Sequence, residues 1–138
     1  MAHLVFCLRR LPHLTREQFQ DYWRTVHAPL VRSHADALGL AAYVQSHALP
    51  EDGNLRLARE RGAPPSFDGI AQLWWHERAL TAQQKDAARR ANAQLLADER
   101  RFIDLAASPI FLVEDHEVLR LFADPRTHDN PAGEREDG

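Results

Sequence analysis

The chain has 138 residues, a net charge of −3 and a single cysteine, Cys7. This length gives room for one domain built around one hydrophobic core. The charged residues form no basic block of the kind that tracks phosphates, so nucleic acid is disfavoured as a partner. A lone cysteine excludes an intrachain disulfide and a thiolate zinc cluster.

The first predicted element is a strand. His3 to Arg9 is apolar and fits a buried, extended segment. The apolar run inside it is too short for the core of a signal peptide or for a membrane span. We therefore expect a cytoplasmic protein that does not associate with membranes.

A helix that begins at Thr15 contains the most informative segment. Gln18 stands three residues further on as its capping-box partner. His27 lies at the margin of an apolar stripe with helical spacing. The stripe consists of Phe19, Trp23, Val26 and Leu30. Pro29 removes a backbone hydrogen bond and bends the helix, or else begins a second short helix that ends near Gly39. An imidazole at such a bend can point into a cavity, whereas the alternative is a buried histidine with satisfied hydrogen bonds.

Two strands and a long connection follow. Leu40 to His47 predicts the second strand, and Asp68 to His76 predicts the third. Between them, residues 49–66 predict an irregular connection. A connection of this length is either a binding lid or a plain solvated loop.

The C-terminal half predicts a long helix and a last strand. Thr81 to Ala107 is alanine-rich, and Asp98 falls inside its apolar face if the helix is unbroken. A carboxylate there must be paired, protonated or directed into a polar cavity, or else it caps a new helical turn. Ile110 to Phe122 predicts the fourth strand. Residues 1–122 would then form the domain, followed by a polar, flexible tail over residues 123–138.

The order of elements, β-α-β-β-α-β, predicts an α+β fold of the ferredoxin-like type. Its antiparallel four-stranded sheet would carry both helices on one face. The other face would be left bare, and a bare apolar face of that size is unusual in a monomer. We therefore expect a homodimer in which two such sheets face each other.

Several motifs resemble the EthD domain family, over nearly the whole chain from Leu4 to about Leu119. They are Leu14-Thr15-Arg16-Glu17-Gln18-Phe19, Tyr22-Trp23, His27-Ala28-Pro29-Leu30, Phe67-Asp68-Gly69-Ile70-Ala71-Gln72-Leu73-Trp74, Asp98-Glu99, Phe102-Ile103-Asp104 and Glu114. The resemblance implies the dimeric α+β barrel superfamily. Its members include cofactor-independent polyketide cyclases, muconolactone-type isomerases, decarboxylases, haem-degrading enzymes and quinone-forming monooxygenases, so the fold leaves the reaction open.

Other catalytic motifs do not occur in this sequence. There is no glycine-rich nucleotide fingerprint and no nucleophile elbow. The nearest candidate for a metal site is Asp115-His116-Glu117, but strand alternation sends His116 to the face opposite its two neighbours. A single histidine could still supply an axial bond to haem. We expect no metal and no other cofactor, which leaves proton chemistry in an apolar pocket.

The leading hypothesis is a cofactor-independent lyase or isomerase that acts on a small polyketide-like or lactone substrate. His27 would move the proton, His47 or Tyr43 would stabilise the enolate oxygen, and Asp98 would set the tautomer of its nearest imidazole. For His47 the alternative is an exposed strand end. Four aromatic side chains could hold the substrate, although core packing is the commoner use of tryptophan. They are Tyr22, Trp23, Tyr43 and Trp74.

Two other hypotheses stay open. One is an oxygen-using monooxygenase, either haem-linked or cofactor-free. The other is a non-catalytic dimeric protein that binds a small ligand and assists another enzyme.

Overall fold

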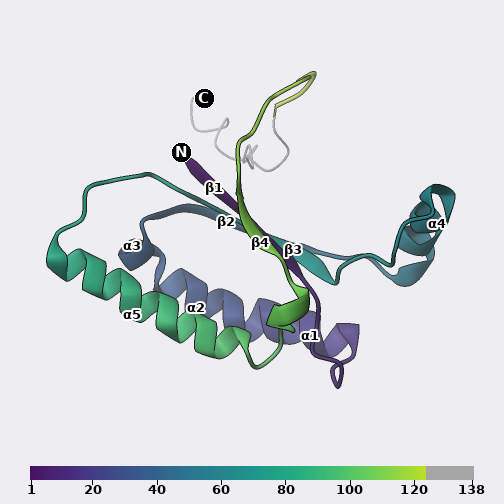
Figure 1. Cartoon of the computed structure of the whole chain (residues 1–138), viewed down its shortest axis with the longest axis horizontal. Coiled ribbons are helices and arrows are strands. Elements are labelled where there is room, and N and C mark those ends of the chain that lie inside the picture. Colours follow the sequence, from purple (N-terminus) through teal and green to yellow (C-terminus); the bar gives the residue numbers. More distant parts are fainter. Residues whose placement is uncertain (124–138) are drawn as a thin grey trace, which may run out of the picture.

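A computed structural model of the chain describes residues 1–123 and shows a four-stranded antiparallel sheet with helices packed on one face (Figure 1). The predicted α+β architecture is confirmed. The strands are β1 Ala2–Leu8, β2 Leu40–His47, β3 Gly69–Trp75 and β4 Ile110–Val113. The helices are α1 Arg16–Tyr22, η1 Trp23–His27, α2 Ala28–Ser33, α3 Ala35–Leu38, α4 Glu51–Arg61, α5 Ala82–Glu99 and η2 Leu105–Ala107.

The strand order is β2-β3-β1-β4, and every neighbouring pair is antiparallel. The register separates the two faces of the sheet, because residues directly opposite each other share a face. Phe6 lies opposite Ala71 and Ile110 and faces the helices. Val5 lies opposite Gln72 and Phe111 and faces away from them. We call these two surfaces the inner face and the outer face.

The core lies between the inner face and the helices. Its fully buried large side chains are Leu8, Phe19, Trp23 and Phe102. The rings of Phe19 and Phe102 pack with centroids 5.5 Å apart, which joins α1 to the segment after α5. The core therefore fixes how α1 and the end of α5 lie against each other, and the candidate site is located at that junction.

The sequence predicted a connection without regular structure between β2 and β3. The structure differs, because this segment contains α4. The helix follows Pro50 and ends at Gly62, whose φ of 60° is the left-handed conformation that glycine tolerates. Its sequence is polar on most sides and lacks an apolar stripe, which explains why periodicity missed it. Figure 1 shows α4 projecting from one end of the molecule.

Two predicted elements are shorter than expected. The helix ends at Glu99 rather than Ala107, because the chain turns there and buries Phe102 in the core. The strand β4 ends at Val113 rather than Phe122. Val113 lies opposite His3 and β1 begins at Ala2, so residues beyond 114 have no strand to pair with. The predicted flexible tail lies, except for residue 123, outside the described residues.

Within residues 1–123, no helix has the length and apolar character that crossing a bilayer requires.

Candidate functional site

The helical segment that carries His27 contains a π-helical turn. The N–H of Ala28 donates to the carbonyl of Trp23, five residues back, where an α-helix would use the fourth. Pro29 follows inside the first turn of α2, where its missing N–H is tolerated. The predicted bend at Pro29 therefore takes the form of a widened turn before it, and the helix continues through the proline.

The π-turn changes which side chains face the core. The α-helical stripe predicted from the sequence placed Val26 inward and His27 at its margin. In the structure Val26 is 46% exposed, while His27 is buried. The buried positions of this segment follow a spacing of four. They are Phe19, Trp23, His27 and Val31. A wider turn advances fewer degrees per residue, so side chains four apart stay aligned across it.

His27 forms a hydrogen-bonded chain with two other side chains. Its Nδ1 lies 2.7 Å from Oδ2 of Asp98, and both residues are buried. The hydroxyl of Tyr22 donates to Oδ1 of the same carboxylate over 2.5 Å. Asp98 thus accepts one hydrogen bond on each oxygen. A carboxylate at Nδ1 holds the proton there and leaves the lone pair on Nε2.

Burial lowers the pKa of His27 below its ordinary value, and the Asp98 carboxylate partly opposes this change. The imidazole is therefore neutral at pH 7. Among the described residues, no side chain or backbone group hydrogen-bonds to its Nε2. The ring can thus accept a proton at Nε2.

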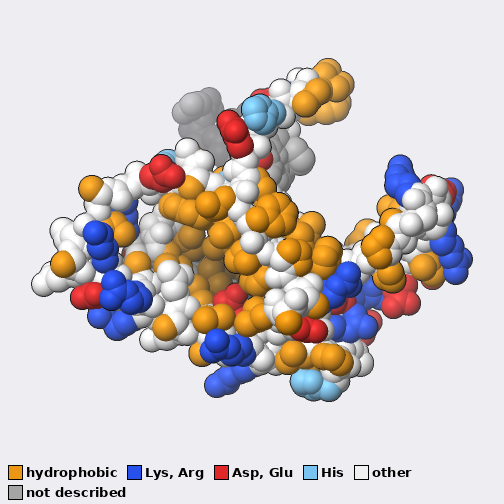
Figure 2. Space-filling view, in the orientation of Figure 1, with side chains coloured by type: hydrophobic (Ala, Val, Ile, Leu, Met, Phe, Trp, Pro, Cys, Tyr) orange, Lys and Arg blue, Asp and Glu red, His pale blue; other side chains and the backbone are white. Residues whose placement is uncertain are grey.

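The ring of His27 lines a cavity of about 180 Å³ between the helices and the inner face. Most of its wall is apolar, and the polar side chains in it are those of His27, Tyr43, Asn92 and Glu99. Figure 2 shows a hollow bordered by hydrophobic side chains with an acidic side chain at its floor. We call this space the His27 cavity.

Glu99 is another ionisable group that lines the His27 cavity, and it was not among the predicted site residues. Burial raises its pKa to about 7, and the neighbouring charge of Asp98 contributes to the increase. Glu99 stands four residues after Leu95 and seven after Asn92, so helical spacing could have identified it as facing inward. Close to neutral pH it can therefore act as a proton donor.

Tyr43 also faces the His27 cavity, from β2. Burial raises its pKa, so the phenol keeps its proton, and the charge of Glu99 acts in the same direction. Its oxygen accepts a hydrogen bond of 2.9 Å from Nε2 of Gln45. The phenol proton thus remains free to be donated.

His47 is not among the residues that line the His27 cavity. Its Nε2 lies 2.8 Å from Oε1 of Gln45, and its ring packs on Trp23 with centroids 4.3 Å apart. The structure therefore does not bring the three predicted catalytic residues together: it joins His27 and Asp98 and leaves His47 beyond the wall. Trp23 is part of that wall and is fully buried, as a core residue is.

Trp74 lies on the opposite side of the sheet from His27, so the expectation that it lines the pocket is wrong. Leu73, not Trp74, pairs with Tyr43, and alternation turns Trp74 to the outer face. There its ring stacks on His3 with centroids 4.3 Å apart. Tyr22, the remaining predicted substrate contact, supports Asp98 and does not line the His27 cavity.

A wider hollow of about 490 Å³ adjoins the His27 cavity. The two share Leu4, Leu38, Leu73 and Asn92. Its far wall includes His76, Glu77 and Arg78 from the connection between β3 and α5. A substrate longer than the His27 cavity could extend into this hollow.

No three His, Cys, Asp or Glu side chains within residues 1–123 lie close enough together to hold a metal ion. The segment singled out as the nearest candidate, Asp115-His116-Glu117, follows the end of β4. Within it Nε2 of His116 lies 3.6 Å from Glu114, and Asp115 pairs with His3.

Comparison with known proteins gives one family and several similar structures. The sequence model of the EthD domain matches residues 11–106, most of the chain. An EthD family protein from Bacillus halodurans is 14% identical, with a TM-score of 0.54 over 84% of this chain and 100% of its own. An EthD-like protein from Ralstonia eutropha is 20% identical, with a TM-score of 0.51 over 82% of this chain and 90% of its own.

A third similar structure is HapK from Hahella chejuensis. It is 11% identical, with a TM-score of 0.52 over 90% of this chain and 100% of its own. At these identities the structural similarity establishes the fold alone. No curated protein sequence matches the chain significantly.

Proposed function

The chain belongs to the EthD domain family, and we propose that it is a cofactor-independent enzyme that transfers protons on a small carbonyl substrate in the His27 cavity. The observation that carries this proposal is the hydrogen bond between Nδ1 of His27 and Asp98, 2.7 Å long, on a ring that lines a mostly apolar cavity. A neutral imidazole held by a carboxylate in such a cavity is suited to general base catalysis.

In the proposed reaction, Nε2 of His27 removes a proton from the carbon next to a carbonyl group. The electron pair moves to the carbonyl oxygen and forms an enolate. Glu99, with its pKa near 7, and the phenol of Tyr43 donate to that oxygen. Return of the proton to the same carbon gives exchange, and return to another carbon gives isomerisation. In an elimination the enolate expels a hydroxyl group on the adjacent carbon, which leaves as water with this proton. In a ring closure the enolate carbon attacks a second carbonyl group of the substrate, whose oxygen takes the proton.

Asp98 acts through His27 and is a positioning residue. By accepting from Nδ1 it fixes the tautomer that presents the Nε2 lone pair, and it stabilises the imidazolium that forms. Tyr22 in turn holds the carboxylate from its other oxygen. The proposed substrates are polyketide-like molecules and lactones, because the walls of the His27 cavity and of the adjoining hollow are largely apolar.

We also propose that the protein is a homodimer. The outer face and the end of β4 expose apolar side chains, among them Ile70, Phe111 and Leu112. A second copy of the sheet would cover this face. Analytical ultracentrifugation at micromolar concentration should show a dimer, and a monomer alone would contradict this part of the proposal.

The test of the catalytic proposal is proton exchange in D₂O, followed by ¹H NMR on a panel of β-ketoesters and unsaturated lactones. The protein should speed deuterium incorporation at the carbon next to the carbonyl for at least one compound. His27→Ala should reduce that rate about 100-fold or more. His13→Ala, which changes an exposed histidine, is the matched control and should keep the full rate.

Full exchange by His27→Ala would refute the role of His27. Saturable binding of a panel compound without exchange would instead indicate a ligand-binding protein. These two results separate the catalytic proposal from the binding alternative.

A further inference from the structure

Another cavity, of about 490 Å³ and separate from the His27 cavity and its adjoining hollow, lies between α4 and the rest of the molecule. Its wall combines arginine side chains with apolar ones and shares no described residue with the His27 cavity. We call it the α4 notch. It is lined by Arg9, Arg10, Pro12, Arg16, Glu51, Asn54, Leu55, Pro65, Ser66, Phe67 and Asp68.

One of the three arginines in the notch is neutralised within the fold. The guanidinium of Arg10 forms an ion pair with Oδ1 of Asp68, and the backbone N–H of Arg10 donates to Oδ2 over 2.9 Å. This bidentate arrangement joins the end of β1 to the start of β3. Both carboxylate oxygens of Asp68 therefore interact with Arg10, and Asp68 does little to neutralise the other two arginines.

Arg16 is only weakly paired although its side chain is just 15% exposed. Its Nη1 donates to the carbonyl of Leu49 over 3.2 Å, and its Nη2 lies 4.0 Å from Glu51. The Glu51 side chain is 74% exposed and stands on the projecting α4. A solvated carboxylate at this distance contributes little and is easily displaced.

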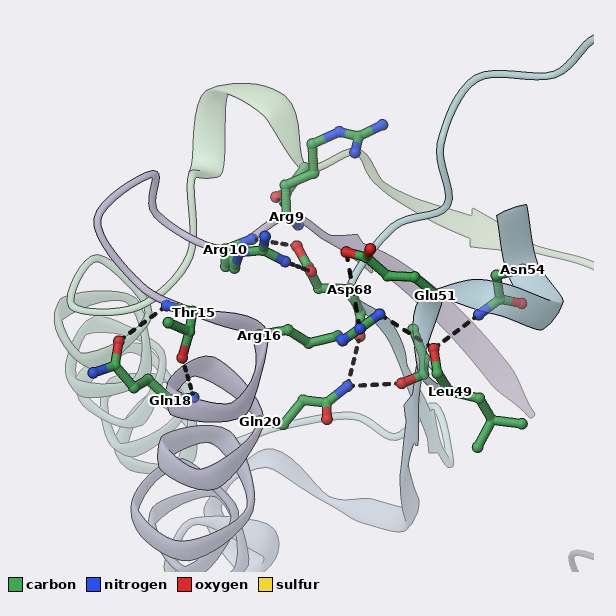
Figure 3. A network of polar contacts seen from close by, with 12 residues as sticks. Arg9, Arg10, Thr15, Arg16, Gln18, Gln20, Leu49, Glu51, Asn54 and Asp68 are labelled. Atoms are coloured by element: carbon green, nitrogen blue, oxygen red, sulfur yellow. Dashed lines mark hydrogen bonds and ion pairs between the residues drawn. The ribbon is translucent and has the colours of Figure 1, made fainter. Parts of the chain in front are cut away.

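Arg9 has no carboxylate partner among the described residues. Its guanidinium lies over the ring of Phe67, 4.3 Å from the centroid. In Figure 3 no dashed line reaches that guanidinium, and in this view the Glu51 carboxylate lies between Arg9 and Arg16. The notch thus holds two guanidinium groups and one loosely held carboxylate, beside an aromatic ring and two prolines.

We propose that the α4 notch binds a small organic carboxylate with an apolar, preferably aromatic, body. The ligand's carboxylate takes the position of Glu51 and pairs with Arg16 and Arg9, whose planar guanidinium groups match carboxylate geometry. Its apolar body packs against Phe67, Leu55 and Pro65. The site is separate from the His27 cavity, so it does not depend on the proposed reaction.

Isothermal titration calorimetry with 2-naphthoate tests the proposal, in a buffer free of carboxylate and phosphate. We expect a dissociation constant between about 1 µM and 1 mM, which weakens as salt is added. The uncharged analogue 2-naphthamide is the ligand control and should bind at least about tenfold more weakly. Equal binding of the amide, or no saturable binding of the acid, would overturn the proposal.

Substitutions in the α4 notch test where the ligand binds, and we expect them to change its affinity in opposite directions. Arg16→Gln and Arg9→Gln should each weaken naphthoate binding, by about tenfold for Arg16. Glu51→Gln should strengthen it severalfold, because it removes the competing carboxylate. Arg89→Gln, on the exposed face of α5, is the matched control and should leave binding unchanged.

Weaker binding by Glu51→Gln would contradict the displacement step. Loss of naphthoate binding in His27→Ala would place the ligand in the His27 cavity and so refute the notch. Glu51 is exposed, so its substitution should not prevent folding, and circular dichroism of each variant checks this.

Discussion

A histidine–aspartate pair lies on each side of the sheet, and the two pairs have similar contacts but different surroundings. His27 and Asp98 meet through Nδ1 at 2.7 Å on the inner face, and His3 and Asp115 meet through Nδ1 at 2.8 Å on the outer face. The second ring nitrogen of His3 lies 2.9 Å from Oε1 of Gln72. That of His27 has no partner among residues 1–123 and belongs to a ring that lines a cavity.

The difference shows that contact with an aspartate does not by itself leave a histidine with a ring nitrogen available to a ligand. His3 is fixed at both nitrogens and stacked on Trp74, so it has no lone pair to offer a ligand. Its aspartate is 67% exposed, whereas Asp98 is buried with a second donor on its other oxygen. The inner pair thus has the unpartnered ring nitrogen that the proposed reaction requires, whereas the outer pair holds the segment after β4 against β1.

The largest expected effect is on stability when the two aspartates are removed in turn. Asp98→Ala removes the acceptor shared by the buried His27 and the half-buried Tyr22, and it should lower the free energy of unfolding by about 3 kcal/mol. Asp115→Ala should cost about 0.5 kcal/mol or less, because water can reach the site it leaves. Urea denaturation followed by tryptophan fluorescence measures both. Equal losses would contradict the distinction between the two pairs.

The second prediction concerns the pH dependence of stability that Glu99 introduces beside the inner pair. The pKa of Glu99 is about 7 in the folded protein and ordinarily 4.5. Its contribution to the free energy of unfolding is therefore fully present below pH 4.5 and is lost as the pH rises through 7. His27, whose pKa is lowered, contributes with the opposite sign: its contribution is present above pH 6.5 and is lost as the pH falls below 6.5 through the lowered pKa of the folded protein.

Glu99→Gln mimics the protonated acid and should remove the first of these two dependences. Between pH 5 and pH 8 the unchanged protein should lose about 2 kcal/mol more than the variant does. Urea denaturation at the two pH values gives this difference directly. Identical slopes would show that Glu99 ionises as an ordinary surface carboxylate does.

A smaller effect is expected at the second donor to Asp98. Tyr22→Phe removes one hydrogen bond to the buried carboxylate and keeps the ring packed on Phe102, so it should cost about 1 kcal/mol. A double-mutant cycle of Tyr22→Phe with Asp98→Asn measures the coupling between the two residues. Strict additivity would mean that they do not act together.

The smallest effect is expected for His3→Gln, and its comparison with His27→Gln separates the proposed chemistry from structure. His3→Gln removes the outer imidazole, and deuterium exchange on the panel of carbonyl compounds should stay within about twofold of the unchanged protein. His27→Gln should abolish that exchange. Loss of exchange in His3→Gln would show that the outer pair contributes to the reaction after all.

The strands and their order along the chain could be predicted because each strand has a local pattern of apolar and β-branched residues, which the sequence shows directly. The sequence also singled out both His27 and Asp98, from a helix bend and from a carboxylate on an apolar face. It failed at Val26 and at Trp74, where one residue of register decides the outcome. The π-turn arises from a shifted backbone hydrogen bond, which the spacing of apolar residues in the sequence does not predict.

Other misses have different causes. Helix α4 is solvated on most sides, so it leaves no periodic signal, although Pro50 before it and Gly62 after it are typical boundary residues. The α4 notch is assembled from segments distant in the chain, between Arg9 and Phe67. Its composition follows from the tertiary fold and could not be read along the sequence.

The π-turn makes the site depend on the number of residues as well as on their identity. This turn contains one residue more than α-helical bonding would place there, which is why position 27, and not position 26, faces the core. A related chain that lacks one residue at this point, such as the exposed Thr25, would keep its histidine inward with ordinary α-helical bonding. A chain that loses the π-turn without losing a residue would rotate its histidine by about 100° around the axis and separate it from the aspartate.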